Sequence, residues 1–222
     1  MFSPSLALQG YAGAWAFGSR RTPDARLMAT WKLTDRFAVS AGAGIEPVVE
    51  NMATLDASLT ARGPFGSLRW APPAGVVDAG ASRQYLSDGN ARTRINLSAS
   101  RIASERARGL RFVVWAEVSR YAVAMPAYFS PSLFIRADAG VEYTHLLLRP
   151  RYAGDRQRSL RVAFLEGTDN HGVRYHHPSL GASLPFGRWF TMNATADWIR
   201  SAAYDESSFT VDIRVNGLAA PR

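Results

Sequence analysis

The sequence predicts an all-β chain of about twelve antiparallel strands, and three observations support this fold class. Polar and apolar residues alternate along most of the 222-residue chain, as in residues 208–215 (Ser-Phe-Thr-Val-Asp-Ile-Arg-Val). A period of two is typical of strands that have one apolar and one polar face. Short clusters rich in Gly, Pro, Asn and Asp separate the alternating segments, as turns require. The apolar residues do not follow the i, i+3, i+4 spacing of an amphipathic helix.

In the N-terminal half, the alternation predicts strand pairs joined by short turns. The polar pair Asp35-Arg36 separates two alternating segments, and Ser87-Asp88-Gly89-Asn90 is a strong turn signal. Arg62-Gly63-Pro64 is expected as a further turn, because Gly and Pro supply special backbone angles. The strands expected in this half are 6–11, 24–34, 37–45, 55–61, 65–70, 77–85 and 94–99.

The C-terminal half begins after a polar connection at 104–109 and continues the same rhythm. The segment 133–145 is the clearest long strand, and at about 3.3 Å per residue it spans roughly 40 Å. That length is enough to cross a bilayer at a tilt. We expect a single domain over residues 1–217 and a short tail over 218–222. The strands expected here are 110–118, 133–145, 160–166, 173–184, 190–198 and 208–215.

Composition excludes several classes of function. The formal net charge is +8, but the arginines are dispersed through strands and turns and form no compact basic run, so no nucleic-acid partner is expected. The chain has no cysteine, which rules out disulfides and thiolate metal sites. It also has no apolar run of the length of a transmembrane helix, about 18 residues.

The alternation alone leaves open what each face of the sheet contacts. In a soluble or periplasmic β-sandwich the apolar face packs into a core, whereas in an outer-membrane barrel it contacts lipid and the polar face lines a lumen. Aromatic residues gather near the expected strand ends, as the interfacial girdles of a membrane barrel require. These residues are Trp31, Phe37, Trp70, Tyr85, Tyr128, Phe129, Trp189, Phe190, Trp198 and Tyr204.

Three segments of the C-terminal half resemble a known family. Residues 128–133 (Tyr-Phe-Ser-Pro-Ser-Leu) resemble the element that begins a strand in the C-terminal outer-membrane β-barrel of the export component of bacterial cellulose synthase and in related exopolysaccharide-export barrels. Residues 175–188 resemble the hairpin that follows, and residues 199–206 resemble the last turn before the closing strand. The resemblance covers roughly the last hundred residues; the first hundred share only the strand rhythm.

The resemblance implies an antiparallel up-and-down transmembrane β-barrel, complete or part of a larger one, that passes a cellulose-like polysaccharide across the outer membrane of a Gram-negative cell. Its implied partners are outer-membrane lipid, the polysaccharide cargo, and a periplasmic helical repeat region or synthase complex. This sequence differs from the family in two features. The family's barrels have more than about twelve strands, and their last strand usually ends in an aromatic residue, whereas this sequence continues past Val215 to residue 222. Since Met1-Phe2-Ser3 leads straight into a strand, we expect the export signal to lie upstream.

Charged residues at alternate positions are the candidates for a hydrated lumen lining. A lining of closely spaced donors and acceptors suits a polyhydroxylated chain, whereas on an exterior face the same residues would only be solvated. The candidates are Arg136, Asp138, Glu142, Arg174, Asp197, Asp212 and Arg214.

Catalytic and metal sites are not expected. His176 and His177 are adjacent, so they point to opposite faces of a strand and cannot chelate one metal ion together. His145 with Glu142 and a serine could form a nucleophilic set, as in a small lipid hydrolase of the outer membrane. The sequence has no Gly-x-Ser-x-Gly elbow and no phosphate-binding loop. We therefore expect a passive conduit without a cofactor, with a sandwich-type binding module for carbohydrate or protein as the alternative and a lipid hydrolase as the third possibility.

Overall fold

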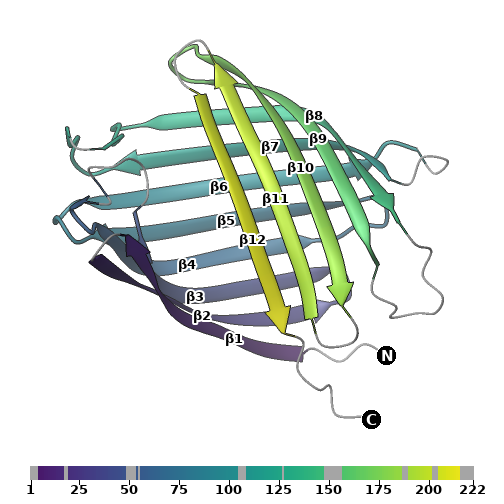
Figure 1. The fold of residues 1–222 in the computed structure, drawn as a ribbon, viewed down its shortest axis with the longest axis horizontal. Helices are drawn as coiled ribbons and strands as arrows, with labels where there is room; N and C mark the ends of the chain where they lie inside the picture. Colours follow the sequence, from purple (N-terminus) through teal and green to yellow (C-terminus); the bar gives the residue numbers. More distant parts are fainter. Residues whose placement is uncertain are drawn as a thin grey trace. The chain divides into compact units, whose positions relative to one another are not determined.

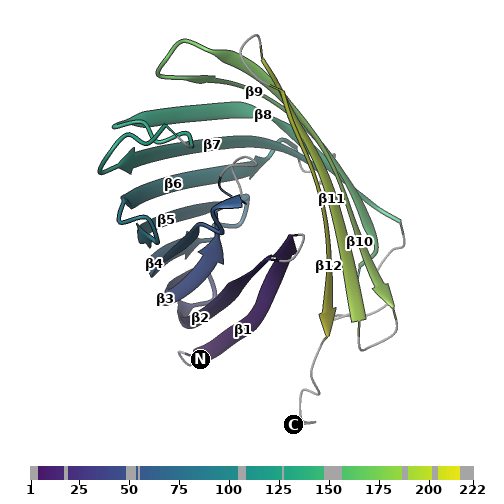
Figure 2. The same ribbon diagram turned by 60° about the vertical axis from the view of Figure 1, so that its left-hand side comes forward.

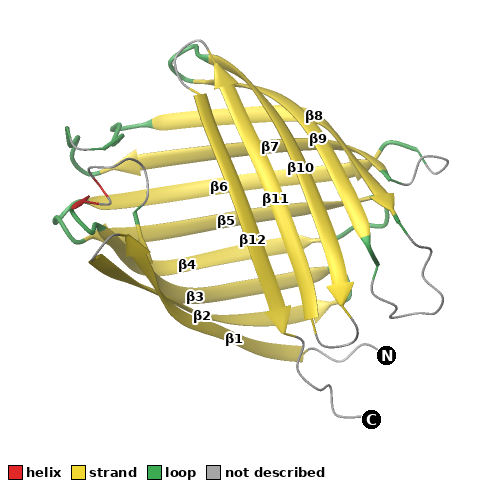
Figure 3. Ribbon diagram, viewed as in Figure 1, coloured by secondary structure: helices red, strands yellow, loops and turns green. Residues whose placement is uncertain are grey.

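The computed structural model describes residues 5–17, 20–48, 54, 56–104, 109–126, 128–147, 157–186, 190–201 and 205–215. Strands make up most of these residues (Figure 3). Within the described segments, no helix has the length and hydropathy needed to cross a membrane. The strands (Figure 1) are β1 (Ser5–Phe17), β2 (Arg20–Thr34), β3 (Phe37–Pro47), β4 (Thr60–Trp70), β5 (Gly75–Leu86), β6 (Ala91–Ile102), β7 (Leu110–Tyr121), β8 (Phe134–Leu146), β9 (Ser159–Asp169), β10 (Arg174–Phe186), β11 (Phe190–Ser201) and β12 (Asp205–Val215).

The strands form an up-and-down meander. In the described part of the chain, one 12-stranded sheet runs in sequence order from β1 to β12. The strand pairs from β1 to β5 and from β9 to β12 are antiparallel. This confirms the predicted all-β, antiparallel, up-and-down fold class. A β-sandwich needs two sheets that pack face to face, so the sandwich alternative is wrong.

The chain divides into two compact units, which we describe separately. The first comprises Met1–Ala99 and Trp115–Arg136, and the second comprises Ser100–Val114 and Ala137–Arg222. In the second unit, β10, β11 and β12 lie side by side (Figure 2). The expected single domain over residues 1–217 stays a prediction, and the expected tail at 218–222 lies outside the described residues, as do Trp189 and Tyr204.

The expected turn at Arg62-Gly63-Pro64 is wrong, because these residues lie inside β4. Gly63 pairs with Gly44, and Pro64 pairs with Ala43, in the ladder between β3 and β4. A Cβ at Gly63 would overlap the carbonyl oxygen of Arg83 on β5, so the glycine is needed for close approach of two strands rather than for a turn. Both turn-forming residues are therefore absorbed into a strand.

The Tyr-Phe-Ser-Pro element precedes the strand that was expected to begin at Leu133. It belongs to the connection between β7 and β8, and β8 begins only at Phe134. Within this connection, Ser130 Oγ accepts a hydrogen bond from the amide of Met125 at 2.5 Å and donates to the carbonyl of the same residue at 3.1 Å. The element thus folds a loop before the strand starts.

The apolar face of the sheet is exposed in both units. In the first unit Leu8 is 71% exposed and Leu27 64% exposed, and in the second Phe209 is 73% exposed. On the opposite face, Arg92 of the first unit and Asp138 of the second are buried. We call the two sides of the sheet the apolar face and the polar face. The exposed residues of the apolar face include Leu6, Leu8, Leu27, Trp31, Leu68, Trp70, Tyr85, Ile95 and Leu97 in the first unit, and Phe112, Val141, Leu160, Val162, Phe164, Leu180, Phe209, Val211 and Ile213 in the second.

This distribution inverts that of a soluble β protein. A soluble sheet buries its apolar residues and exposes its charges, because burial of apolar area is the main favourable term in folding. Here the apolar side chains of one face are exposed, and the opposite face carries the buried charged residues Arg92 and Asp138, as in a sheet whose apolar side contacts lipid. The alternation left open what each face of the sheet contacts. The buried residues lie on the polar face, so the apolar face is the exposed one.

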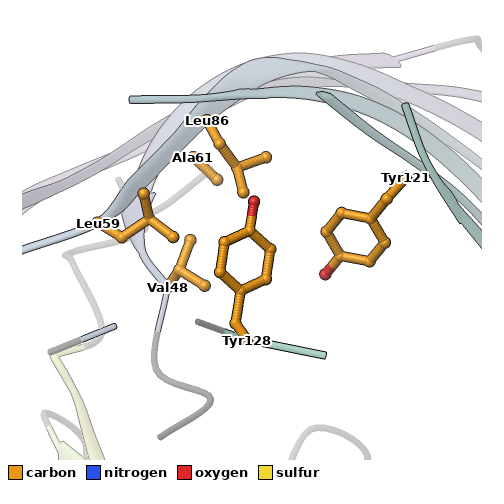
Figure 4. Packing of buried hydrophobic residues seen from close by; sticks show 6 residues of the cluster. All are labelled: Val48, Leu59, Ala61, Leu86, Tyr121 and Tyr128. Atoms are coloured by element: carbon orange, nitrogen blue, oxygen red, sulfur yellow. The ribbon is translucent and has the colours of Figure 1, made fainter. Parts of the chain in front are cut away.

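A small apolar cluster covers one end of the polar face in the first unit. It combines residues from the ends of β4, β5 and β7 with residues from the two long connections after β3 and β7 (Figure 4). The rings of Tyr121 and Tyr128 are 5.9 Å apart between centroids, and Met125 packs against the cluster. Its buried members are Val48, Leu59, Ala61, Leu86, Tyr121 and Tyr128.

Candidate functional site

The polar face of the second unit contains four of the predicted lining residues in direct polar contacts. Glu142 on β8 forms an ion pair with Arg161 on β9 at 3.4 Å. Asp212 on β12 accepts a hydrogen bond from Asn193 Nδ2 at 3.0 Å. Asp138 and Asp197 lie in the cluster described next, so the structure places all four on the polar face, as the alternation predicted.

Asp138 is the centre of a buried polar cluster. It is only 4% exposed, and its carboxylate accepts a hydrogen bond from the hydroxyl of Tyr175 on β10. Nδ1 of His177 lies 3.6 Å from the same carboxylate, and Nε2 of His177 lies 3.5 Å from Asp197 on β11. The cluster therefore links β10 and β11 to β8, across the intervening strand β9. A buried carboxylate is retained because polar partners surround it.

Tyr175 and His177 were not predicted from the sequence as partners of Asp138. Tyr175 is 1% exposed and pairs with Gly167 on β9. A Cβ at Gly167 would overlap the phenol ring, so the glycine leaves the space that Tyr175 fills. The signal was present in the alternation, since Tyr175, His177 and Ser179 share one face of β10.

Arg174 is not part of this polar face. It is exposed and pairs with Thr168, one residue before Tyr175, so it points to the face that carries Leu180. As the first residue of β10, it follows a turn directly, which places its charge at the rim of the sheet. Arg214 pairs with Thr191 in the ladder, and its side chain lies outside what the structure describes.

His176 and His177 point to opposite faces of β10, as the alternation predicted. His176 is exposed on the apolar face, 3.3 Å from Glu166 and stacked on Phe164, whereas His177 faces the polar cluster. His145 also lies on the apolar face, where its ring is 6.3 Å from that of Tyr143. Glu142 lies on the other face, so the nucleophilic set of His145 and Glu142 is not assembled.

In the first unit, Arg92 organises the polar face. This arginine is 6% exposed, and its Nη2 and Nε donate to Gln84 Oε1 at 2.6 and 2.9 Å. Gln84 in turn donates to Glu46 at 2.7 Å, and Arg92 Nη1 donates to the Tyr121 hydroxyl at 3.1 Å. A side chain with five donors in a planar fork suits such a role.

Two further contacts extend this network along β7 and β8. Arg94 pairs with Glu117 at 3.2 Å, and the guanidinium of Arg136 lies 4.9 Å from the ring centre of Trp115. Arg136 is therefore the predicted lining residue that stands on the polar face of the first unit. Arg92 and Arg94 were not predicted as lining residues, although their alternation with Ile95 and Leu97 places them on this face.

The aromatic residues near strand ends fall into two groups in the first unit. Trp31 and Trp70 are exposed where β2 and β4 end, and Tyr85 and Phe129 are exposed at the opposite strand ends. Two bands of aromatic residues at the ends of an exposed apolar face match the girdles of membrane barrels. Tyr128 departs from the expectation because it is buried in the loop cluster.

Tyr128, in the connection between β7 and β8, forms hydrogen bonds with the turn between β5 and β6. Its hydroxyl donates to Asp88 at 2.9 Å and accepts from Asn90 Nδ2 at 2.9 Å. Asn90 also exchanges two hydrogen bonds with the backbone of Val123, at 2.8 and 3.0 Å. One asparagine therefore fixes both the start and the middle of the loop.

Burial raises the pKa of Tyr128 to about 12 from an ordinary value of 10.0; the hydrogen bond from Asn90 opposes this rise and Asp88 adds to it. A raised pKa in the folded state means that the neutral phenol stabilises the loop at every pH below about 10, and that this contribution is lost as the pH rises towards 12. We expect the phenolate absorbance of the wild type minus that of Tyr128→Phe to titrate with a midpoint near 12. A midpoint near 10 would mean that Tyr128 is solvated.

The meander, the exposed apolar face and the opposite face with its buried charged residues Arg92 and Asp138 define the fold class of an outer-membrane β-barrel. A comparison with solved structures gives a more particular likeness, to a protein described as "Bacterial polysaccharide outer membrane secretin". The TM-score is 0.70 at 17% sequence identity, and the match covers 96% of this chain and 75% of the other. The likeness shows that the two chains share a fold. No protein-family model matches the chain, and no curated protein matches it either.

Proposed function

We propose that this protein is an outer-membrane β-barrel that passes a polysaccharide across the membrane as a passive conduit. The observation that carries the proposal is the inversion of the sheet, in which apolar side chains are exposed on one face and Arg92 and Asp138 are buried among polar partners on the other. The fold likeness to a polysaccharide outer-membrane secretin supports the choice of cargo. A cellulose-like chain is the more specific cargo that the Tyr-Phe-Ser-Pro resemblance suggests.

The chemistry of the polar face suits such a cargo. Its donors and acceptors include arginine, carboxylate, amide and hydroxyl groups, as in the Ser183, Asn193 and Asp212 chain on β10, β11 and β12. Sugar hydroxyls both donate and accept, so they exchange readily among such groups. Outer-membrane lipid would surround the apolar face, and a periplasmic helical repeat region or synthase complex would deliver the chain.

Transport and not catalysis is proposed, because the one nucleophilic set suggested by the sequence is divided between two faces. Glu142 is on the polar face with Arg161, and His145 is on the apolar face. A lipid hydrolase would need its base and its orienting acid within hydrogen-bond reach.

Reconstitution in planar bilayers tests the proposal. We expect the purified protein to migrate on gels in a heat-modifiable way and to produce discrete conductance steps, and we expect deletion of its gene to reduce the polysaccharide on the cell surface. A protein that is released as a soluble monomer by lysis without detergent would refute the membrane assignment. A folded, membrane-inserted protein without conductance would refute the conduit alone.

A further inference from the structure

Two aromatic side chains on the polar face of the first unit are not explained by contact with lipid. Tyr11 and Trp15 on β1 are each 53% exposed. In the ladder they pair with Arg26 and Thr22, so they stand on the opposite face from Leu8 and Leu27. Exposed apolar surface that is rimmed by polar residues can mark a ligand-binding groove.

One carboxylate holds both rings. Asp24 accepts a hydrogen bond from the Tyr11 hydroxyl at 2.9 Å and from Trp15 Nε1 at 3.0 Å. Gly13 pairs with Asp24 and lies between the two aromatic residues on β1. The polar tips of the rings are therefore fixed and their flat faces remain open. Such preorganisation lowers the entropic cost of binding a ligand.

The rings border two adjoining recesses that share Tyr11, Glu46 and Arg94 as lining residues. The first has a volume of about 310 Å³ and the second about 350 Å³. Both values are at the lower end of the range for ligand sites. Gly44, Gly63 and Gly80, on the polar face, are among the residues that line the first recess.

The polar groups around these recesses are already ordered. Glu46 is held by Gln84 and lies 3.6 Å from Arg92, and the guanidinium of Arg26 lies 3.8 Å from the ring centre of Phe65. A flat aromatic face binds the C–H face of a pyranose ring, and carboxylate, amide and guanidinium groups bind its hydroxyls. Tyr11 and Trp15 are four residues apart on one strand, about 13 Å, so one oligosaccharide could contact both rings.

We infer that Tyr11 and Trp15, with Asp24 as their positioning residue, form a subsite for the pyranose rings of the transported chain. This inference rests on the proposed function, because it takes the chain to be the cargo. Glu46 and Arg26 contact the sugar hydroxyls at this subsite. Asp24 acts through the two rings and not by direct contact.

Calorimetric binding to the full-length protein in detergent tests the subsite without relying on conductance. The probes are three hexasaccharides, one neutral (cello-hexaose), one anionic (hexagalacturonate) and one cationic (chitosan hexamer). We expect at least one to bind, and Tyr11→Ala and Trp15→Ala each to weaken that binding by about three- to tenfold. Tyr11→Phe keeps the ring and stays within about threefold of the wild type.

Tyr85→Ala is the matched control, because it removes an exposed aromatic from the apolar face of the same unit. Its affinity should equal that of the wild type, and heat-modifiable migration confirms that every variant is folded. If no hexasaccharide binds, or if the Tyr11 and Trp15 variants bind as well as Tyr85→Ala does, the subsite is refuted. Conductance without oligosaccharide binding would support the conduit and refute the subsite. Oligosaccharide binding without conductance would support the subsite and refute the conduit.

Discussion

Replacing Val141 by arginine is expected to destabilise the protein in a bilayer by about 2–4 kcal/mol. Val141 lies near the middle of β8, is 41% exposed, and stands on the apolar face. A guanidinium at this position would have to leave water for hydrocarbon, a transfer that is costly for a charged side chain. Urea-dependent unfolding from lipid vesicles measures the change.

Neighbouring positions on β12 provide a matched control for the face. Val211 is exposed on the apolar face, and Thr210 is exposed on the polar face. We expect Val211→Arg to cost about as much as Val141→Arg, whereas Thr210→Arg changes the unfolding free energy by less than about 1 kcal/mol. Equal effects at the two positions would contradict the assignment of lipid to one face.

The two-residue period predicted the strands because it reflects which side chains share a face, and sheet faces do not depend on distant parts of the chain. The segment 133–145 was expected as one strand and β8 spans Phe134–Leu146. What the period could not say is whether the apolar or the polar face is covered. That distinction needed the burial of Asp138 and Arg92, which only the assembled sheet provides.

Turn-forming residues predicted the strand boundaries less reliably than the two-residue alternation predicted the strands. Gly63-Pro64 carries a strong turn signal, yet the ladder with β3 continues through both residues. Glycine fits a turn because it lacks a Cβ, and the same property permits the close approach of Arg83 on β5. The two uses of glycine give the same sequence signal, and only the position of the neighbouring strand separates them.

The two-residue period indicates the face on which each candidate side chain lies, whereas the contacts of that side chain depend on strand register. Asp138, Glu142, Asp197 and Asp212 lie on the polar face, as expected. Arg174 was assigned by its charge, although its even spacing from Leu180 places the two on one face. The contact between Asp138 and Tyr175 depends on how β8, β9 and β10 are aligned, and a long connection between β8 and β9 leaves that alignment unspecified in the sequence.

The second large effect is expected at Tyr175. Tyr175→Ala should destabilise the protein by about 3–5 kcal/mol, because it empties the space above Gly167 and removes the hydroxyl that donates to Asp138. Tyr175→Phe keeps the ring and removes only the donor, so we expect about 1–3 kcal/mol. Unfolding midpoints and slopes in detergent or vesicles give both values.

The comparison between these variants separates packing from polar satisfaction. If Tyr175→Phe costs as much as Tyr175→Ala, the hydrogen bond to Asp138 supplies the whole effect and the ring over Gly167 supplies none. Asp138→Asn in the Tyr175→Phe background then removes the buried charge, and we expect it to recover part of the loss, since a buried carboxylate without its donor is more costly than a neutral amide. A double variant that is less stable than Tyr175→Phe would instead show that His177, 3.6 Å from Asp138, is the partner that holds the carboxylate in place.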